Sequence, residues 1–346
     1  FPVFLANLLR RKGYAVTFLS FEQEPREPGV RALLHKDVPV ICNFRHLNKI
    51  VEEFGIDVIH SHHAWVDNTV LDILSPKSRA RALVTMHGMY EGLPDGSREK
   101  IVRRLARDAA EIVFTADKNL KALKEFGLGD LPKVSRIPNA LADTPFQPVA
   151  RASLGVPETA FLLCLVSRAI PEKGWEEAIR AVEAARARSS RDIHLLLIGE
   201  GPEYDRLRAE LSPDWVHYLG FRQNLRDYFA TADMGLLPSR FSGESYPLVL
   251  IDCLATGTPI IASAIGEIPK MLDAGGLEAG ALFELEDGQI PVSKLAGIIS
   301  EFADDANRLE DVRQLTGDAY KKFDPSVMVS RYVDIYQRIF SAGAKR

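Results

Sequence analysis

Short apolar runs alternate with longer amphipathic stretches along this chain, and this alternation constrains its fold more than any other feature. Apolar runs suit strands buried on both faces, and the stretches between them suit covering helices. We therefore expect parallel α/β sheets with helices on both faces. The expected strands cover residues 15–18, 38–42, 58–60, 82–86, 112–115, 134–137, 161–166, 194–198, 216–219, 234–237, 260–262 and 281–283. The expected helices cover residues 43–54, 68–74, 97–110, 118–126, 175–187, 203–211, 225–230, 248–255 and 326–340.

The pattern occurs twice, with a break at residues 139–157 that is rich in Pro, Ala and Thr and has no clear period. A chain of 346 residues is too long for one ordinary core. We therefore expect two doubly wound domains joined by a linker. In such sheets ligands bind at the carboxyl ends of the strands, so two domains of this kind predict a cleft between them.

The bulk composition excludes several classes of protein. The net charge of −4 gives no general basic field for nucleic acid. Three cysteines without a C-x-x-C pair indicate reduced thiols in a cytoplasmic protein. The sequence shows neither a long apolar span nor a signal peptide. Because the chain starts at Phe1, without Met and already in helix-like sequence, we expect residues to precede it.

Two cations follow the expected strand 161–166. Arg168 and Lys173 lie on the loop between that strand and the next expected helix. A strand end, two cations and a helix N-terminus together favour an anion such as a diphosphate. The alternative is a solvated surface loop, as for most such Arg and Lys pairs.

Paired glycines follow the next expected strand. Gly199 and Gly201 allow a tight turn and the close approach of a backbone to a nucleotide. The alternative is an ordinary turn between a strand and a helix. Residues 257–263 and 266–269 end a helix, form a strand and turn again, and we expect them to frame the same cleft.

Two acids flank the start of the expected helix 248–255. Glu244 lies just before this helix, and Asp252 follows with seven residues between, on an otherwise apolar stretch. Carboxylates so placed can accept hydrogen bonds from sugar hydroxyls. The alternatives are a capping charge for Glu244 and, for Asp252, a buried acid satisfied by the backbone.

Together these segments resemble the retaining nucleotide-sugar glycosyltransferases of the GT-B fold, in glycosyltransferase family four (glycosyl transferases group 1). The resemblance covers nearly the whole chain and is strongest over residues 161–270, through S-R-x-x-P-E-K-G, I-G-x-G-P and the two spaced acids. The first half carries D-V-I-H-S-H at 57–62, T-M-H-G at 85–88 and I-P-N at 137–139. The resemblance implies two Rossmann-like domains facing a central cleft. It places residues 1–145 in an acceptor-side domain, with 325–346 packing back on it, and residues 146–324 in the nucleotide-sugar domain.

The resemblance also implies residue roles. Arg168 and Lys173 would bind the donor diphosphate and neutralise its developing charge. Glu244 would hold the transferred sugar, and His87 would contact it from the first domain. The remaining donor-binding positions would serve the base (Gly199, Gly201, Phe221, Arg222), the phosphates through backbone N–H groups (Ser245, Tyr246, Leu248) and the ribose (Asp252). The enzyme would need no cofactor and no metal, and the nucleotide sugar would be its substrate.

The sequence departs from the family pattern at several positions. Asp252 stands where the family has Glu, one methylene longer, so the ribose contact is expected to weaken or to run through water. Pro247 replaces a Gly and removes one N–H donor. The turn at Asn139 lacks its following Gly. The family's first strand and Gly-rich loop would precede Phe1.

Two further groups of residues carry weaker hypotheses. His60, His62 and His63 do not converge as metal ligands, and we expect them at strand ends near the acceptor. A basic stripe runs along one face of the expected helix 97–110. It is either a solvated face or a contact with anionic lipid headgroups at the inner membrane face, in keeping with a lipid-linked acceptor. The stripe consists of Lys100, Arg103, Arg104 and Arg107.

The predicted function is transfer of a sugar from a nucleotide-diphosphate-sugar to a glycan or lipid-linked glycan, with retained anomeric configuration. Two alternatives stay open. A GT-B-fold sugar-nucleotide epimerase would use the nucleotide sugar without an acceptor. A degenerate nucleotide-binding scaffold would bind nucleotide without turnover. The donor base, the sugar and the acceptor are not coded in recognisable side chains.

Overall fold

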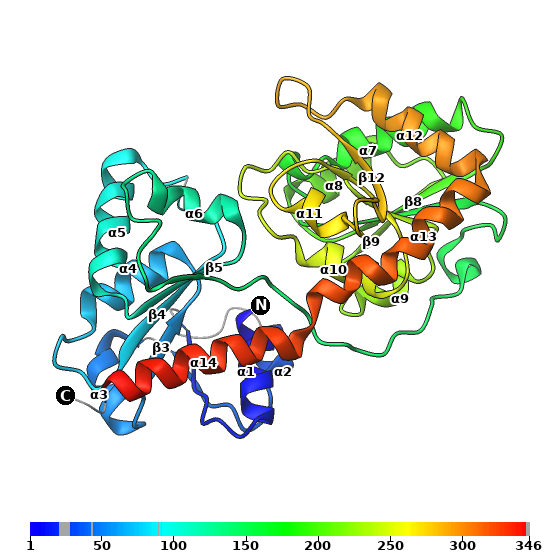
Figure 1. The fold of residues 1–346 in the computed structure, drawn as a ribbon. Coiled ribbons are helices and arrows are strands. Elements are labelled where there is room, and N and C mark those ends of the chain that lie inside the picture. The colour runs from blue at the N-terminus through cyan, green and yellow to red at the C-terminus, as the bar shows by residue number, and fades with distance from the viewer. Residues whose placement is uncertain (21–27, 43, 89, 91, 344–346) are drawn as a thin grey trace. The chain divides into compact units, whose positions relative to one another are not determined.

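The computed structural model describes residues 1–20, 28–42, 44–88, 90 and 92–343. The chain divides into two compact units, one made of residues 1–142 and 324–346 and the other of residues 143–323. Both units are built from parallel strands and helices (Figure 1). The expected α/β class is thereby confirmed.

The first unit contains a four-stranded parallel sheet in the order β3-β4-β5-β6 and a separate parallel pair, β1-β2. Its strands are β1 (Phe18–Ser20), β2 (Val40–Cys42), β3 (Val58–Ser61), β4 (Arg81–Met86), β5 (Glu111–Phe114) and β6 (Val134–Arg136). Its helices are α1 (Pro2–Arg11), α2 (Pro28–Leu33), the 3-10 turn η1 (Phe44–His46), α3 (Leu47–Glu53), α4 (Ala64–Ile73), α5 (Asp95–Asp108), α6 (Asp117–Lys124) and α14 (Pro325–Gly343).

The closing helix α14 belongs to this first unit although it follows the whole of the second unit in sequence (Figure 1). Its buried residues, including Tyr332, Ile335 and Ile339, share one apolar cluster with Leu83 of β4 and Val113 of β5. Burial of such side chains is worth roughly 1.5–3 kcal/mol each, so α14 is an integral part of the first core.

The second unit contains a six-stranded parallel sheet. Its strands are β7 (Phe161–Val166), β8 (Ile193–Ile198), β9 (Val216–Gly220), β10 (Met234–Leu237), β11 (Ile260–Ser263) and β12 (Gly280–Phe283). Its helices are α7 (Trp175–Arg186), α8 (Pro202–Glu210), α9 (Leu225–Phe229), α10 (Leu248–Ala255), α11 (Ile268–Leu272), α12 (Val292–Asp304) and α13 (Ala306–Tyr320), with the 3-10 turns η2 (Arg151–Leu154), η3 (Pro171–Lys173) and η4 (Lys321–Phe323). Every residue of β7 and β8 is buried, as strands covered on both faces require.

The strand order of the second sheet is β12-β11-β10-β7-β8-β9. The chain therefore starts at β7, builds outward through β8 and β9, and then returns to the other side of β7 to add β10, β11 and β12. This is the doubly wound order, in which the direction reverses between β7 and β10. At such a switch point the loops after the two strands part and leave room for a ligand at their carboxyl ends.

Most expected elements agree with the structure within one or two residues, and β7, β10 and α10 have the expected bounds. The first expected strand, 15–18, is wrong. The strand is Phe18–Ser20, because this segment pairs in parallel with Val40–Cys42. The expected start of the helix 43–54 at Asn43 lies outside the described residues. Helices α2, α11, α12 and α13 are not among the expected elements, and α4 begins at Ala64, four residues before the expected helix 68–74.

The segment expected as a linker, 139–157, has two parts. Residues 137–150 form neither helix nor strand, whereas η2 follows at Arg151–Leu154. The Arg151 guanidinium donates to the carbonyl oxygen of Ala160 at 2.7 Å and pairs with Asp233 at 3.0 Å. These contacts fasten the second part to the core of the second unit.

Candidate functional site

The loops on either side of the switch point bring three of the expected residues together. Arg168 follows β7, Lys173 ends η3, and Glu244 lies on the loop between β10 and α10. Lys173 Nζ forms an ion pair with Glu244 Oε2, and the two side chains are only 11% and 9% exposed. Arg168 is exposed. A buried carboxylate and two cations at the carboxyl ends of parallel strands can bind an anion and a hydroxyl group together.

The expected glycine turn after β8 lies against the same loop. Gly199 and Gly201 have φ angles of 143° and 147°. A Cβ at either position would overlap a carbonyl oxygen, that of Ser167 for Gly199 and that of Ala169 for Gly201. The Ala169 N–H also donates to the carbonyl oxygen of Glu200 at 2.8 Å. Glycine is therefore required for the close contact between the loops after β7 and β8.

The segment between Glu244 and α10 is closely packed. Ser245 is buried, and its carbonyl oxygen accepts from the Glu267 N–H at 2.9 Å. The Tyr246 ring packs edge-on against Phe323, with centroids 6.0 Å apart. Leu248 begins α10 and is half-buried. These contacts fix the backbone that the sequence predicts to face the phosphates.

Asp252, one turn into α10, has a partner that the sequence did not reveal. Its Oδ1 accepts from the Nε of Arg226 in α9 at 2.8 Å. Burial raises the pKa of Asp252, and the pairing with Arg226 opposes that shift. The alternative that the backbone satisfies this acid is therefore wrong, because the side chain of Arg226 does so. A ribose at Asp252 would share the carboxylate with this arginine.

The expected base-binding loop after β9 is open to solvent. Phe221 is 60% exposed. The Nε of Arg222 donates to the Tyr228 hydroxyl at 3.0 Å, which holds the loop against α9. Gly220, the last residue of β9, accepts from the Gly199 N–H at 3.0 Å. This bond joins the expected base loop to the glycine turn.

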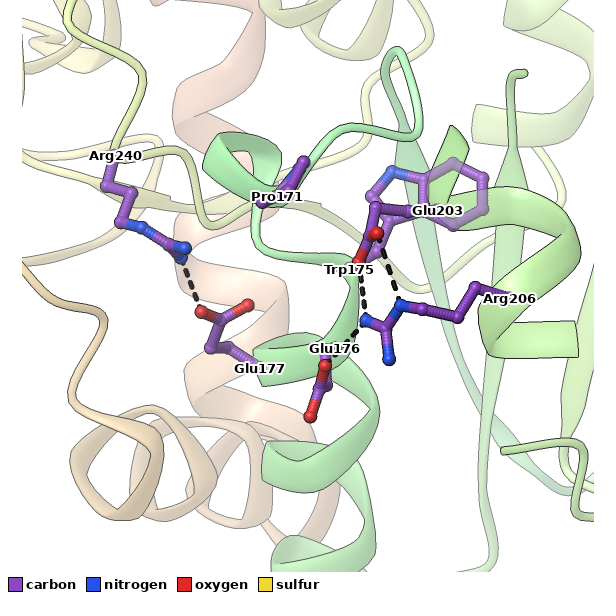
Figure 2. A pocket seen from close by; sticks show the side chains of 7 residues that line it. All are labelled: Pro171, Trp175, Glu176, Glu177, Glu203, Arg206 and Arg240. Carbon is purple, nitrogen blue, oxygen red and sulfur yellow. Dashed lines mark hydrogen bonds and ion pairs between the residues drawn. The ribbon is translucent and has the colours of Figure 1, made fainter. Parts of the chain in front are cut away.

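A pocket of about 240 Å³ lies beside this group, at the start of α7 (Figure 2). Glu177 faces Arg240, and Arg206 bonds both Glu176 and Glu203 (Figure 2). Both arginines are thus neutralised by carboxylates. This pocket is a network of ion pairs that ties the loops together, and it lacks the unpaired cation that an anion site needs.

The first unit contains a group of half-buried histidines at the ends of β3 and β4. His60 bonds the Tyr336 hydroxyl at 2.8 Å and the Thr85 hydroxyl at 2.7 Å, and His62 lies 3.2 Å from His87 between ring nitrogens. Burial lowers the pKa of His60 and of His87 to about 3, so both imidazoles are neutral. Among the residues described, no three His, Cys, Asp or Glu side chains are arranged to hold a metal ion.

A buried acid near this group was not expected from the sequence. Asp67, in the first turn of α4, is fully buried and accepts from the Tyr90 hydroxyl. Burial raises the pKa of Asp67 to about 7, although the bond from Tyr90 opposes that shift. The sequence gives no signal for the pairing of Asp67 with Tyr90, because Tyr90 lies on a loop that is distant along the chain.

Three members of the basic stripe on α5 are paired with acids. Arg103 bonds Glu99 at 2.8 Å, Arg104 bonds Asp72 at 2.8 Å, and Arg107 bonds Asp108 at 2.7 Å. These pairs are typical of a solvated helix face. No helix within the described ranges is both long and apolar enough to cross a membrane.

The sequence reasoning also missed Phe241, which lies at the centre of the group in the second unit. Its ring centroid is 5.5 Å from the guanidinium carbon of Arg168 and 5.0 Å from Lys173 Nζ. No spacing or motif marks this residue, because its role depends on three loops that meet only in the folded chain.

Comparison with known proteins adds independent evidence. A family model described as "Glycosyltransferase Family 4" matches residues 3–143, and one described as "Glycosyl transferases group 1" matches residues 160–301. The phosphatidyl-myo-inositol mannosyltransferase of Mycolicibacterium smegmatis is 26% identical over 99% of this chain and 90% of that protein. An exopolysaccharide phosphotransferase of Streptomyces coelicolor is 29% identical over 72% of this chain, but only 25% of that protein is covered.

The fold has close counterparts among solved structures. The crystal structure of HepE from Anabaena in complex with UDP matches with a TM-score of 0.78 and 17% identity, covering 94% of this chain and all of that one. The similarity shows a shared GT-B fold. The two family models, which match residues 3–143 and 160–301, identify this chain as a member of glycosyltransferase family 4, the glycosyl transferases group 1.

Proposed function

We propose that this protein transfers a hexose from a nucleotide-diphosphate-sugar to a glycan or lipid-linked glycan, with retention of the anomeric configuration. The observation that carries the proposal is the convergence of Arg168, Lys173 and Glu244 at the switch point of the second sheet. A GDP-mannose-dependent mannosyltransferase among the relatives and a UDP-glucose complex among the solved folds support the same class of donor.

Each of the three side chains has a chemical task in this proposal. Arg168 and Lys173 bind the diphosphate and stabilise the charge that develops on it as it leaves, which is usually the largest catalytic term. Glu244 accepts a hydrogen bond from a hydroxyl of the transferred sugar. Lys173 and Glu244 form an ion pair with each other. The donor replaces this pair, because it brings an anion for Lys173 and a hydroxyl donor for Glu244.

The other donor contacts surround this centre. We propose that the backbone N–H groups of Ser245, Tyr246 and Leu248 face the phosphates and that Asp252 holds the ribose while remaining bonded to Arg226. The base rests over the glycine turn of Gly199 and Gly201 and against the exposed loop of Phe221 and Arg222. In this arrangement side-chain cations take the place of a divalent ion, and the reaction needs no metal.

The chemical step breaks the bond between the anomeric carbon and the diphosphate oxygen. The acceptor hydroxyl forms its bond on the same face, and its proton goes to an oxygen of the departing diphosphate. In the first unit we propose His87 as a catalytic residue, which contacts the donor sugar. Since burial keeps its imidazole neutral, His87 acts as a hydrogen-bonding group and not as a cation.

A peripheral contact with an anionic inner membrane face is a separate proposal. It rests on Lys100, Arg103, Arg104 and Arg107 of α5, of which Lys100, Arg103 and Arg107 are exposed. Each of the three arginines is paired with a carboxylate, so a lipid phosphate would have to take the place of that carboxylate. Flotation with vesicles of rising phosphatidylserine content tests this membrane contact. Binding that does not depend on the anionic lipid would contradict the proposal.

The proposed activity is tested by nucleoside diphosphate release from a panel of nucleotide sugars, with and without glycan and polyprenol-linked acceptors, in the presence of EDTA. We expect one donor to be consumed only with an acceptor, and Glu244→Ala to lose this activity while Lys321→Met retains it. Consumption without an acceptor, with conversion to another nucleotide sugar, would indicate an epimerase. Binding of nucleotide without turnover of any donor would indicate a degenerate scaffold.

A further inference from the structure

An aromatic ring lies under both cations of the proposed diphosphate site. Phe241 is on the loop after β10, and its centroid is 5.5 Å from the guanidinium carbon of Arg168 and 5.0 Å from Lys173 Nζ. The two cations come from different places, one from the loop after β7 and the other from η3. One half-buried side chain therefore organises both.

An aromatic ring can hold two cations near each other without cancelling their charge. Two like charges near one point repel each other, and an acid between them would remove the positive potential that a diphosphate needs. The face of an aromatic ring attracts cations and carries no net charge. Lys173 has its ion pair with Glu244, whereas Arg168 forms no ion pair with any residue in the described part of the chain. The positive charge of Arg168 thus stays available to a ligand.

The loop that carries the ring is fastened through the two residues that precede it, Ser239 and Arg240. The backbone N–H of Arg240 donates to the carbonyl oxygen of Glu172 at 2.8 Å, and its guanidinium pairs with Glu177 of α7 (Figure 2). The Phe241 N–H donates to the Ser239 hydroxyl at 3.2 Å. The Ser263 hydroxyl at the end of β11 donates to the Ser239 carbonyl oxygen at 2.6 Å. The position of the ring is therefore set by the sheet and by α7.

We infer that Phe241 is a positioning residue, whose ring aims Arg168 and Lys173 together at the diphosphate of a nucleotide sugar. The inference rests on the proposed function and adds a residue that neither the sequence motifs nor the family resemblance assigns. It makes the loop after β10 contribute twice to the site, through Glu244 for the sugar and through Phe241 for the phosphates.

The test compares Phe241→Leu, which keeps an apolar side chain but loses the ring face, with Phe241→Tyr, which keeps the face. Titration calorimetry measures binding of UDP, GDP, ADP and TDP to the wild-type chain. The nucleoside diphosphate that binds is then titrated into both variants beside its nucleoside and inorganic pyrophosphate. Phe340→Leu, at an exposed position on α14, is the matched control for the substitution itself.

We expect Phe241→Leu to weaken binding of the diphosphate and of pyrophosphate about tenfold, the effect of losing two cation–π contacts. Binding of the nucleoside should change less than about twofold, since the nucleoside carries no phosphate. Phe241→Tyr should restore wild-type affinity. Equal weakening of nucleoside and diphosphate would show only a packing role and would overturn the inference, as would unchanged diphosphate affinity. If the wild-type chain binds none of the four diphosphates, the proposed function itself fails.

Discussion

Removing one partner of the Lys173–Glu244 ion pair should destabilise the second unit, because the remaining charge is left with little access to water. The two side chains are 11% and 9% exposed. Breaking a buried ion pair in this way costs about 3–5 kcal/mol. Since a small part of each side chain still meets solvent, we expect Lys173→Met and Glu244→Gln each to cost about 3 kcal/mol, at the lower end of that range.

The double variant separates the ion pair from the packing of the two side chains. With both charges removed, no uncompensated ion remains, so the double variant should be less destabilised than the sum of the single ones. We expect a coupling free energy of about 2–3 kcal/mol from the four unfolding free energies. An exposed pair would give a coupling free energy of at most about 1 kcal/mol.

Tryptophan fluorescence in a urea titration can follow the second unit selectively. Of the three tryptophans, Trp175 and Trp215 are 1% and 8% exposed and belong to the second unit. Trp65 of the first unit is 60% exposed and should report little on unfolding. Lys321→Met and Asp318→Asn, which break an exposed pair of the same unit, are the matched controls. Each control should change the unfolding free energy by less than about 0.5 kcal/mol.

Additive losses of unfolding free energy in the two single variants would refute this reasoning. If the double variant loses the sum of the two single losses within about 0.5 kcal/mol, the two charges do not depend on each other. If the single variants also match the exposed controls, the pair is not buried in solution. In either case the close contact of Lys173 with Glu244 would not describe the ligand-free protein.

Three further predictions concern other residues of both units. Burial raises the pKa of Asp67 from 3.8 to about 7, so its contribution to stability is lost as the pH rises through that range. Asp67→Asn should therefore gain up to about 4 kcal/mol over the native chain between pH 4 and pH 8, which calorimetric unfolding of both proteins at each pH would reveal. Because burial lowers the pKa values of His60 and His87 to about 3, the first unit should lose stability as the pH falls below about 6.5. The protection of β4 against hydrogen exchange should therefore be lower at pH 5 than at pH 7. Gly199→Ala should cost more than about 3 kcal/mol, since the added Cβ overlaps a backbone oxygen at a left-handed φ, and retention of the wild-type urea midpoint would contradict this.

The strands and helices around the site could be predicted because their signals are local. The run F-L-L-C-L-V is typical of a strand covered on both faces, and the structure buries all of it. Arg168 and Lys173 follow an expected strand, and Glu244 precedes an expected helix. These local signals are sufficient to predict that the three residues belong to one site. The first strand was misplaced because its bounds depend on pairing with Val40–Cys42, which lies far along the chain.

Partners fixed by tertiary contact were beyond sequence reasoning. Asp252 was expected to be satisfied by backbone or by a ribose, but the fold turns Arg226 of α9 toward it. Phe241 has no motif of its own, and only the meeting of three loops places it under two cations. The ion pairs of the basic stripe were also hidden in part, since Asp72 lies on α4 and not on α5.

The most direct test of the account is the stability of the second unit with nucleoside diphosphates, read from tryptophan fluorescence. At a hundred times its dissociation constant, a bound ligand should add about 2.7 kcal/mol to the unfolding free energy. We predict a gain of this size with at least one nucleoside diphosphate, and its loss in the Arg168→Met, Lys173→Met double variant. If no nucleoside diphosphate stabilises the wild-type chain, or if the double variant is stabilised equally, these cations do not bind a diphosphate and the central claim is wrong.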